Sequence, residues 1–277
     1  MAVIGIDLGT TNSLAGVWQD GKVVLIPNAF GEYLTPSVVS IGKNQEVFVG
    51  SVAKEMLATQ PYDTFREFKR NMGTNFLYGN GRKKYRAEEL SAFVLRRLKE
   101  DAEKFLGEEV TEAVISVPAY FDDNKRNATK NAGRLAGLKV ERLINEPSAV
   151  ALKHHTAEKG AESFIVFDFG GGTLDVSLVE AFDNVVEIQA VAGDNYLGGK
   201  DFNEIIAQDF YEQNQISEAY LTKNEQENVL KEAEAVKKEL TDKNEAERQV
   251  YIKGEAYTLK MTNQRLIHLS AELFSRM

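Results

Sequence analysis

Two stretches of this chain repeat one pattern. Residues 4–17 read IGIDLGTTNSLAGV, and residues 165–179 read IVFDFGGGTLDVSLV. Aligning the Asp of each stretch also aligns Gly9 with Gly170, so both read as an apolar strand, an Asp, a turn of Gly and Thr, and a second strand. The copies lie about 160 residues apart, which predicts two similar lobes that each carry an Asp–Gly hairpin.

Strands and helices alternate around these repeats. Apolar residues have helical spacing over 87–106, and Gly107 predicts a C-terminal cap there. Further strands are expected at 23–26, 37–41, 114–117 and 140–144, and further helices at 122–136, from Pro147, at 199–214, at 224–240 and from Thr262 to Met277. This order is typical of an α/β protein. We expect residues 1–155 to form lobe I and residues 156–277 to form lobe II.

Composition narrows the classes of function. The chain has 277 residues, of which 43% are hydrophobic and 27% charged, as in a globular protein of about two domains. The net charge of -9 argues against nucleic acids and membrane surfaces as partners, because both are anionic. The absence of Cys excludes disulfides and thiolate sites. No secretory signal or long apolar run is present, so we expect a cytoplasmic protein.

The two turns are candidate phosphate sites. A tight turn rich in Gly and Thr leaves backbone N–H groups pointing one way, and Gly allows close approach to phosphate oxygens. Thr10, Thr11 and Thr173 add hydroxyl donors. One such turn alone could be a plain β-turn, but two at matched positions favour phosphate binding.

Carboxylates adjoin both turns and predict a bound cation. Asp7, Asp168 and Asp175 would repel a phosphate unless a cation lay between them. A hard cation with oxygen ligands and retained waters fits, namely Mg²⁺. A P-loop is not supported, because Val23 follows Gly21-Lys22 where a Ser or Thr is required.

Six segments resemble, in order, the nucleotide-binding domain of DnaK-type heat-shock chaperones, members of the actin-like ATPase superfamily. They are VIGIDLGTTNS (3–13), FKRNMG (68–73), SVPAYFDDNKR (116–126), LINEPSAVAL (143–152), VFDFGGGTLDVSL (166–178) and GDNYLGGKDFN (193–203). The third and fourth segments favour this family over actin or the sugar kinases. The resemblance covers the whole chain and implies the duplicated, ribonuclease H-like α/β fold of that superfamily.

The resemblance also implies residue roles at a site for ATP or ADP. The residues that would contact the phosphates or the nucleotide are Gly9, Thr10, Thr11, Asn12, Gly170, Gly171, Gly172, Thr173, Gly198 and Gly199. Asp7 and Asp168 would hold Mg²⁺ largely through waters, and K⁺ is a further candidate cation. Lys69 would lie near the γ-phosphate, Glu146 would orient metal or water, and Asp175 would position the attacking water or accept its proton, with Thr173 also in the catalytic set.

Each of these charged residues has a simpler interpretation. Lys69 could be a solvated surface Lys, Glu146 a helix N-terminal Glu favoured by the macrodipole, and Asp175 a strand-edge Asp. Phosphoryl transfer needs mainly positioning and charge stabilisation, so the residues as assigned would suffice for it.

The resemblance places the adenosine contacts on the helix expected at 224–240. Glu234, Lys237, Lys238 and Thr241 share one face of it. The alternative is a solvated charged face. Lys238 stands where the family usually has Arg, which stacks better on a ring, and Lys200 replaces a usual Glu.

The implied function is that of a chaperone ATPase domain that controls a C-terminal peptide-binding domain. Its partners would be client peptides, a J-domain co-chaperone and a nucleotide-exchange factor. A metabolite kinase and a nucleotide-binding switch without catalysis remain as alternatives. The short stretch between Lys69 and Ala87 resembles the bacterial HscC-type branch. The family's later Gly-rich adenosine segment is not found, so we expect lobe II to be incomplete and ATP to bind more weakly than to a longer version. We expect ATP hydrolysis in the intact protein and little or no turnover by this chain alone.

Overall fold

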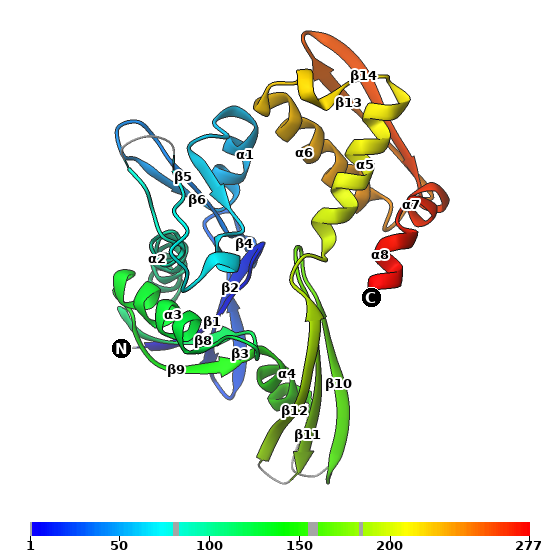
Figure 1. Cartoon of the computed structure of the whole chain (residues 1–277). Helices are drawn as coiled ribbons and strands as arrows, with labels where there is room; N and C mark the ends of the chain where they lie inside the picture. Colours follow the sequence, from blue (N-terminus) through cyan, green and yellow to red (C-terminus); the bar gives the residue numbers. More distant parts are fainter. Residues whose placement is uncertain (1, 80–82, 155–159, 183–184) are drawn as a thin grey trace. The chain divides into compact units, whose positions relative to one another are not determined.

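The computed structural model describes residues 2–79, 83–154, 160–182 and 185–277 (Figure 1). The chain divides into two compact units. Unit 1 comprises Met1–Lys54, Tyr62–Asp168 and Asp175–Gly193, and unit 2 comprises Glu55–Pro61, Phe169–Leu174 and Asp194–Met277. Both contain helices and strands, as expected of an α/β fold. The predicted lobe boundary between residues 155 and 156 lies outside the described residues and stays a prediction.

A mixed sheet forms the centre of unit 1. Its strands are β1 (Ala2–Leu8), β2 (Asn12–Gln19), β3 (Lys22–Ile26), β8 (Val110–Val117) and β9 (Lys139–Asn145), in the order β3-β2-β1-β8-β9, with the short β4 (Thr35–Pro36) paired to β2. The β1–β2 and β2–β3 pairs are antiparallel, whereas β1–β8 and β8–β9 are parallel. The predicted first hairpin is confirmed. Because strand side chains alternate, Ile4, Ile6 and Leu8 all enter the core.

Two capped helices complete the core of unit 1. These are α2 (Ala87–Leu106) and α3 (Asp123–Leu135). Gly107 ends α2 in the left-handed conformation with φ 70°, and the Asp122 side chain accepts from the Lys125 N–H at the start of α3, both as predicted. Leu90, Leu95 and other α2 residues are fully buried with the sheet, and each such side chain stabilises the fold by ~1.5–3 kcal/mol.

A smaller layer of unit 1 was only partly predicted. It contains β5 (Val38–Ile41) between β6 (Val47–Val49) and β7 (Thr64–Arg66), followed by the 3₁₀ helix η1 (Phe68–Asn71). The helix α1 (Ser51–Thr59) begins in unit 1, and its residues from Glu55 onward belong to unit 2. Only β5 had a sequence signal. The strands β6 and β7 have three residues each, too few to show an alternating pattern.

The second hairpin of the repeat is also present. Strands β10 (Glu162–Phe169), β11 (Leu174–Phe182) and β12 (Val185–Asp194) form a sheet in that order, which repeats the β1-β2-β3 succession. The helix α4 (Glu146–His154) precedes them and begins directly after β9. The turn residues between β10 and β11 belong to unit 2.

Unit 2 has its own core. It contains α5 (Gly199–Gln213), the 3₁₀ helix η3 (Glu218–Tyr220), α6 (Lys223–Glu239) and the hairpin β13 (Glu245–Ile252) and β14 (Glu255–Thr262). The hairpin was not predicted. Its two turn residues, Lys253 and Gly254, both have positive φ, 51° and 85°, as a two-residue type I′ turn requires.

The prediction of one helix from Thr262 to Met277 was wrong. Thr262 does cap a helix, since its side chain accepts from the Arg265 N–H, but α7 (Asn263–Leu269) ends at Ser270 and α8 (Ala271–Arg276) follows. Ser270 has φ −91° and ψ 10°, outside the α-helical range, and Ser is weak in helix interiors because it competes for backbone hydrogen bonds. No helix in the described part of the chain is long and apolar enough to span a membrane.

Candidate functional site

Parallel strands of unit 1 bring polar side chains to one sheet edge. Asp7 of β1 lies opposite Ser116 of β8, and Val117 lies opposite Asn145 of β9. The Ser116 hydroxyl donates to the Asp7 carboxylate at 2.9 Å. Because α4 begins directly after β9, Glu146 enters the same edge. The carboxyl ends of parallel strands are where α/β sheets place their ligand sites.

Lys69 reaches this edge from η1. The flanking Phe68 and Met72 are buried in the core and fix the segment. Lys69 is only 8% exposed, and its Nζ lies 2.8 Å from Glu146 Oε1. The interpretation of Lys69 as a solvated surface residue is therefore wrong. Glu146 is the first residue of α4, as the simpler interpretation requires, and it also pairs with Lys69. Its role toward a metal ion or water stays a prediction.

Negative charge accumulates around this ion pair. Burial raises the pKa of Glu146, Lys69 lowers it, and the Asp7 and Asp168 carboxylates raise it again. The pKa of Asp168 is raised by partial loss of hydration and by the nearby Asp7, while Lys69 opposes the shift. The Asp7 carboxylate thus disfavours ionisation of both Glu146 and Asp168. A bound cation would relieve this repulsion.

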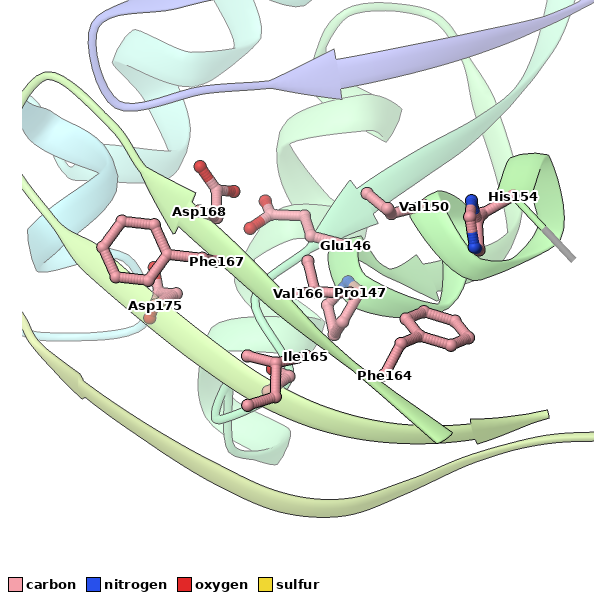
Figure 2. Close-up of a pocket in the computed structure, with 11 residues that line it drawn as sticks. Glu146, Pro147, Val150, His154, Phe164, Ile165, Val166, Phe167, Asp168 and Asp175 are labelled. Carbon is pink, nitrogen blue, oxygen red and sulfur yellow. The ribbon is translucent and has the colours of Figure 1, made fainter. Parts of the chain in front are cut away.

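A cavity of about 600 Å³ is lined in one part by the carboxylates of Glu146, Asp168 and Asp175 (Figure 2). In Figure 2 the Glu146 carboxyl group points toward Asp168, and Asp175 of β11 also lines the cavity. Away from them the lining is apolar and ends at His154 and Phe164, whose rings meet edge to face at 5.2 Å. The cavity therefore has an anionic part and an apolar part.

The first Gly–Thr turn is fixed by Ser37. Its hydroxyl donates to the Gly9 carbonyl at 2.8 Å, and its N–H donates to the Thr11 carbonyl at 2.8 Å. A side chain at Gly9 would collide with the Asn12 carbonyl, so the tight turn requires Gly there. Thr11 and Asn12 are exposed, and Thr10 is half-buried.

The second turn lies in unit 2 beside the start of α5. The Gly170 N–H donates to the Thr173 carbonyl at 2.9 Å and closes the turn. Gly198 and Gly199 pack against this turn. Gly171 and Thr173 are half-buried, and Gly172 is buried.

The predicted adenosine residues share the exposed side of α6 and its end. Glu234 and Lys237 are half-buried, and Lys238 and Thr241 are exposed. The Lys238 ammonium pairs with Glu234 at 2.7 Å, and the Lys237 ammonium donates to the Gly199 carbonyl. The structure thus links Lys237 to the residue beside the second turn, and the adenosine contacts stay a prediction.

One comparison with known proteins decides the family. A family model described as Hsp70 protein matches residues 3–79 and 78–277. The chain belongs to the Hsp70 family. Hsp70 proteins are chaperones with ATPase activity, and their nucleotide-binding domains bind ATP or ADP with Mg²⁺. The predicted actin-like α/β fold is confirmed, whereas the HscC-type branch stays a prediction.

Three site residues were missed in the sequence. Ser37 and Ser116 have no signal of their own, although both lie in strands that were predicted, at 37–41 and 114–117. Tyr120 adjoins the carboxylates, since burial and the charges of Asp175 and Glu146 raise its pKa. Their roles depend on which strands are neighbours, and this order appears only in the fold.

Proposed function

We propose that this Hsp70 chain is part of a nucleotide-binding domain that, in the intact protein, binds ATP with Mg²⁺ and hydrolyses it. One observation carries the proposal. A largely buried Lys69–Glu146 ion pair adjoins two carboxylates, Asp7 near the carboxyl end of the parallel strand β1 and Asp168 near the end of β10. A structural ion pair alone does not require additional carboxylates whose charges raise the pKa of Glu146. A site for a cation and a polyanion does, because the cation compensates them.

The residues of the site fit Mg²⁺. Within the described ranges, no three His, Asp or Glu side chains are grouped to ligate a metal directly. Mg²⁺ keeps several waters and takes one or two carboxylates with phosphate oxygens, which suits Asp7 and Asp168. When bound, the ion would neutralise developing charge on the phosphates. K⁺ is a further proposed cation.

The chain's own groups would then act on the nucleotide and the water. The turns at Gly9–Asn12 and Gly170–Thr173 offer backbone N–H and hydroxyl donors to phosphate oxygens. Lys69 supplies the buried positive charge near the γ-phosphate, and Glu146 fixes its ammonium. Asp175 positions the attacking water or accepts its proton. These roles are mainly positioning and charge stabilisation, which phosphoryl transfer requires.

We further propose that the domain works in a DnaK-type chaperone. Nucleotide state would control a C-terminal peptide-binding domain that holds client peptides. A J-domain co-chaperone and a nucleotide-exchange factor would act on the cycle. Family membership supports these partners in general, since Hsp70 proteins act with clients and co-chaperones.

Single-turnover ATP hydrolysis by the intact protein tests the proposal. Lys69→Ala should slow the chemical step by ~100-fold or more, because it removes charge stabilisation from the transition state. Lys43→Ala, which changes an exposed Lys of the same unit, is the matched control and should hydrolyse ATP at the wild-type rate. Equal rates for Lys69→Ala and wild type would favour a nucleotide-binding switch. A large stimulation by a sugar or acid acceptor would favour a metabolite kinase.

A further inference from the structure

Lys69 lies on a helix of a single turn. In η1 the Arg70 N–H donates to the Glu67 carbonyl at 3.2 Å, and the Met72 N–H donates to the Lys69 carbonyl at 3.1 Å. Helices this short are not stable by themselves, because few hydrogen bonds offset the ordering of the backbone. Glu67, directly before η1, has φ 58°, a left-handed conformation that is unfavourable for a residue with a side chain. The position of Lys69 therefore depends on contacts from outside η1.

The two ends of η1 are anchored in different ways. Phe68 and Met72 are buried in the apolar core of unit 1. Asn71, the last residue of η1, is held by a polar contact, since its side-chain Nδ2 donates to the Tyr78 hydroxyl at 2.7 Å. Asn71 and Tyr78 are both half-buried. A hydrogen bond in such surroundings is stronger than one in water, because the local dielectric is lower.

Tyr78 is itself fixed by the short segment that leads to α2. Its N–H donates to the Tyr85 carbonyl, and the Tyr85 N–H donates to the Tyr78 carbonyl, both at 2.8 Å. Its ring meets those of Phe65, Phe68 and Phe76 edge to face, at centroid distances of 6.1, 6.5 and 4.8 Å. Aromatic pairs in this geometry stabilise a fold beyond the area that they bury. The hydroxyl is therefore presented to Asn71 from a fixed position.

We propose that Tyr78 is a positioning residue for Lys69. Its hydroxyl holds Asn71 and so fixes the end of η1, the element from which the Lys69 ammonium reaches Glu146. The short segment between Lys69 and Ala87 thus has a role in the site. The expected effect on hydrolysis rests on the proposed function, whereas the contact between Asn71 and Tyr78 needs no nucleotide.

Amide hydrogen exchange of this chain without nucleotide tests the contact. Tyr78→Phe removes only the hydroxyl and should speed exchange of the Met72 amide about fivefold, the ordinary effect of losing one hydrogen bond. Strand β8 lies between β1 and β9 in the central sheet, so its amides report on opening of the whole core and should keep their wild-type rates. Unchanged exchange at Met72, or an equal increase in β8, would overturn the proposal.

Two further variants separate the hydrogen bond from the packing of the rings. Tyr85→Phe removes a hydroxyl from the other residue of the same backbone pair and should leave exchange at Met72 unchanged. Asn71→Ala removes the donor and should reproduce the effect of Tyr78→Phe. Combining Asn71→Ala with Tyr78→Phe should add little, because both break the same hydrogen bond. Additive effects, or faster exchange at Met72 in Tyr85→Phe, would count against the proposal.

Single-turnover hydrolysis by the intact protein at saturating ATP tests the link to Lys69. Tyr78→Phe should slow the chemical step about fivefold and leave the affinity for ATP unchanged, because Lys69 acts mainly on the transition state. In the Lys69→Ala background, Tyr78→Phe should have no further effect. A fivefold loss in that background, or the wild-type rate in Tyr78→Phe alone, would overturn the positioning role. If Lys69→Ala itself hydrolysed ATP at the wild-type rate, the proposed function would fail, and the exchange results would still decide whether Tyr78 fixes η1.

Discussion

Replacing Lys69 by Met should destabilise unit 1 in a pH-dependent way. The Lys69 Nζ and Glu146 Oε1 lie 2.8 Å apart, and at an effective dielectric of about 20 two such charges attract by ~6 kcal/mol. Desolvation of both ions offsets part of this energy. Removing one partner leaves the other buried without its counter-charge, which typically costs ~3–5 kcal/mol. We therefore expect Lys69→Met to lower the free energy of unfolding by ~3 kcal/mol at pH 8.

The double substitution distinguishes charge pairing from simple packing loss. Lys69→Met with Glu146→Gln removes both charges, so it should cost only ~1 kcal/mol, less than either single substitution. Urea unfolding followed by circular dichroism measures these losses. Additive losses in the double variant would show that the pair is not coupled and would refute the reasoning.

The pH dependence of the Lys69→Met variant follows from Glu146. Burial already raises the pKa of this carboxyl, and removing Lys69 removes a group that lowers it. The folded state then binds the proton more tightly than the unfolded state, so stability falls as pH rises above the ordinary Glu pKa and through the raised one. The loss caused by Lys69→Met should be smallest near pH 4 and largest at pH 8. A loss that is constant over this range would contradict the assignment.

Further substitutions test the metal site and the placement of Lys69. Asp7→Asn and Asp168→Asn should each lower Mg²⁺-dependent ATP hydrolysis by ~10–100-fold, measured in single turnover, and wild-type hydrolysis in either would remove that residue from the site. Gly73→Ala should cost more than ~2 kcal/mol, because Gly73 has φ 72° and a Cβ there would lie 2.8 Å from the Asn124 carbonyl carbon. Gly107→Ala is its control in urea unfolding, since Gly107 has φ 70° and open space around it and should lose only ~1 kcal/mol. If both variants lost the same free energy of unfolding, the close packing of Gly73 near Lys69 would not contribute to stability.

Local patterns were sufficient to predict the elements with strong signals. The repeat around Asp7 and Asp168 predicted both hairpins, and Gly107 and Asp122 marked real helix ends. The helix expected near the C-terminus was divided because the apolar spacing continued through Ser270, while the backbone did not. Periodicity shows which face of an element is apolar, but it does not show where a single residue leaves the helical conformation.

The ion pair at the candidate site could not be predicted from spacing. Lys69 and Glu146 are 77 positions apart, and nothing in either segment indicates that a short 3₁₀ helix carries one to the other. The family resemblance identified Lys69 and Glu146 as site residues, but it did not predict that they contact each other. Lys237 shows the same limit. Helical spacing grouped it with Glu234 and Lys238, whereas its ammonium contacts the Gly199 carbonyl from another element. Contacts between distant segments depend on topology.

Calorimetric titration of ATP into this chain, with Mg²⁺ and with Mg²⁺ chelated, tests the central claim most directly. If Asp7 and Asp168 hold the cation that compensates their charge, ATP should bind saturably with Mg²⁺, and affinity should fall at least ~tenfold when Mg²⁺ is removed or when Asp168 is replaced by Asn. Wild-type affinity in Asp168→Asn, or ATP binding that is the same with and without Mg²⁺, would contradict the account.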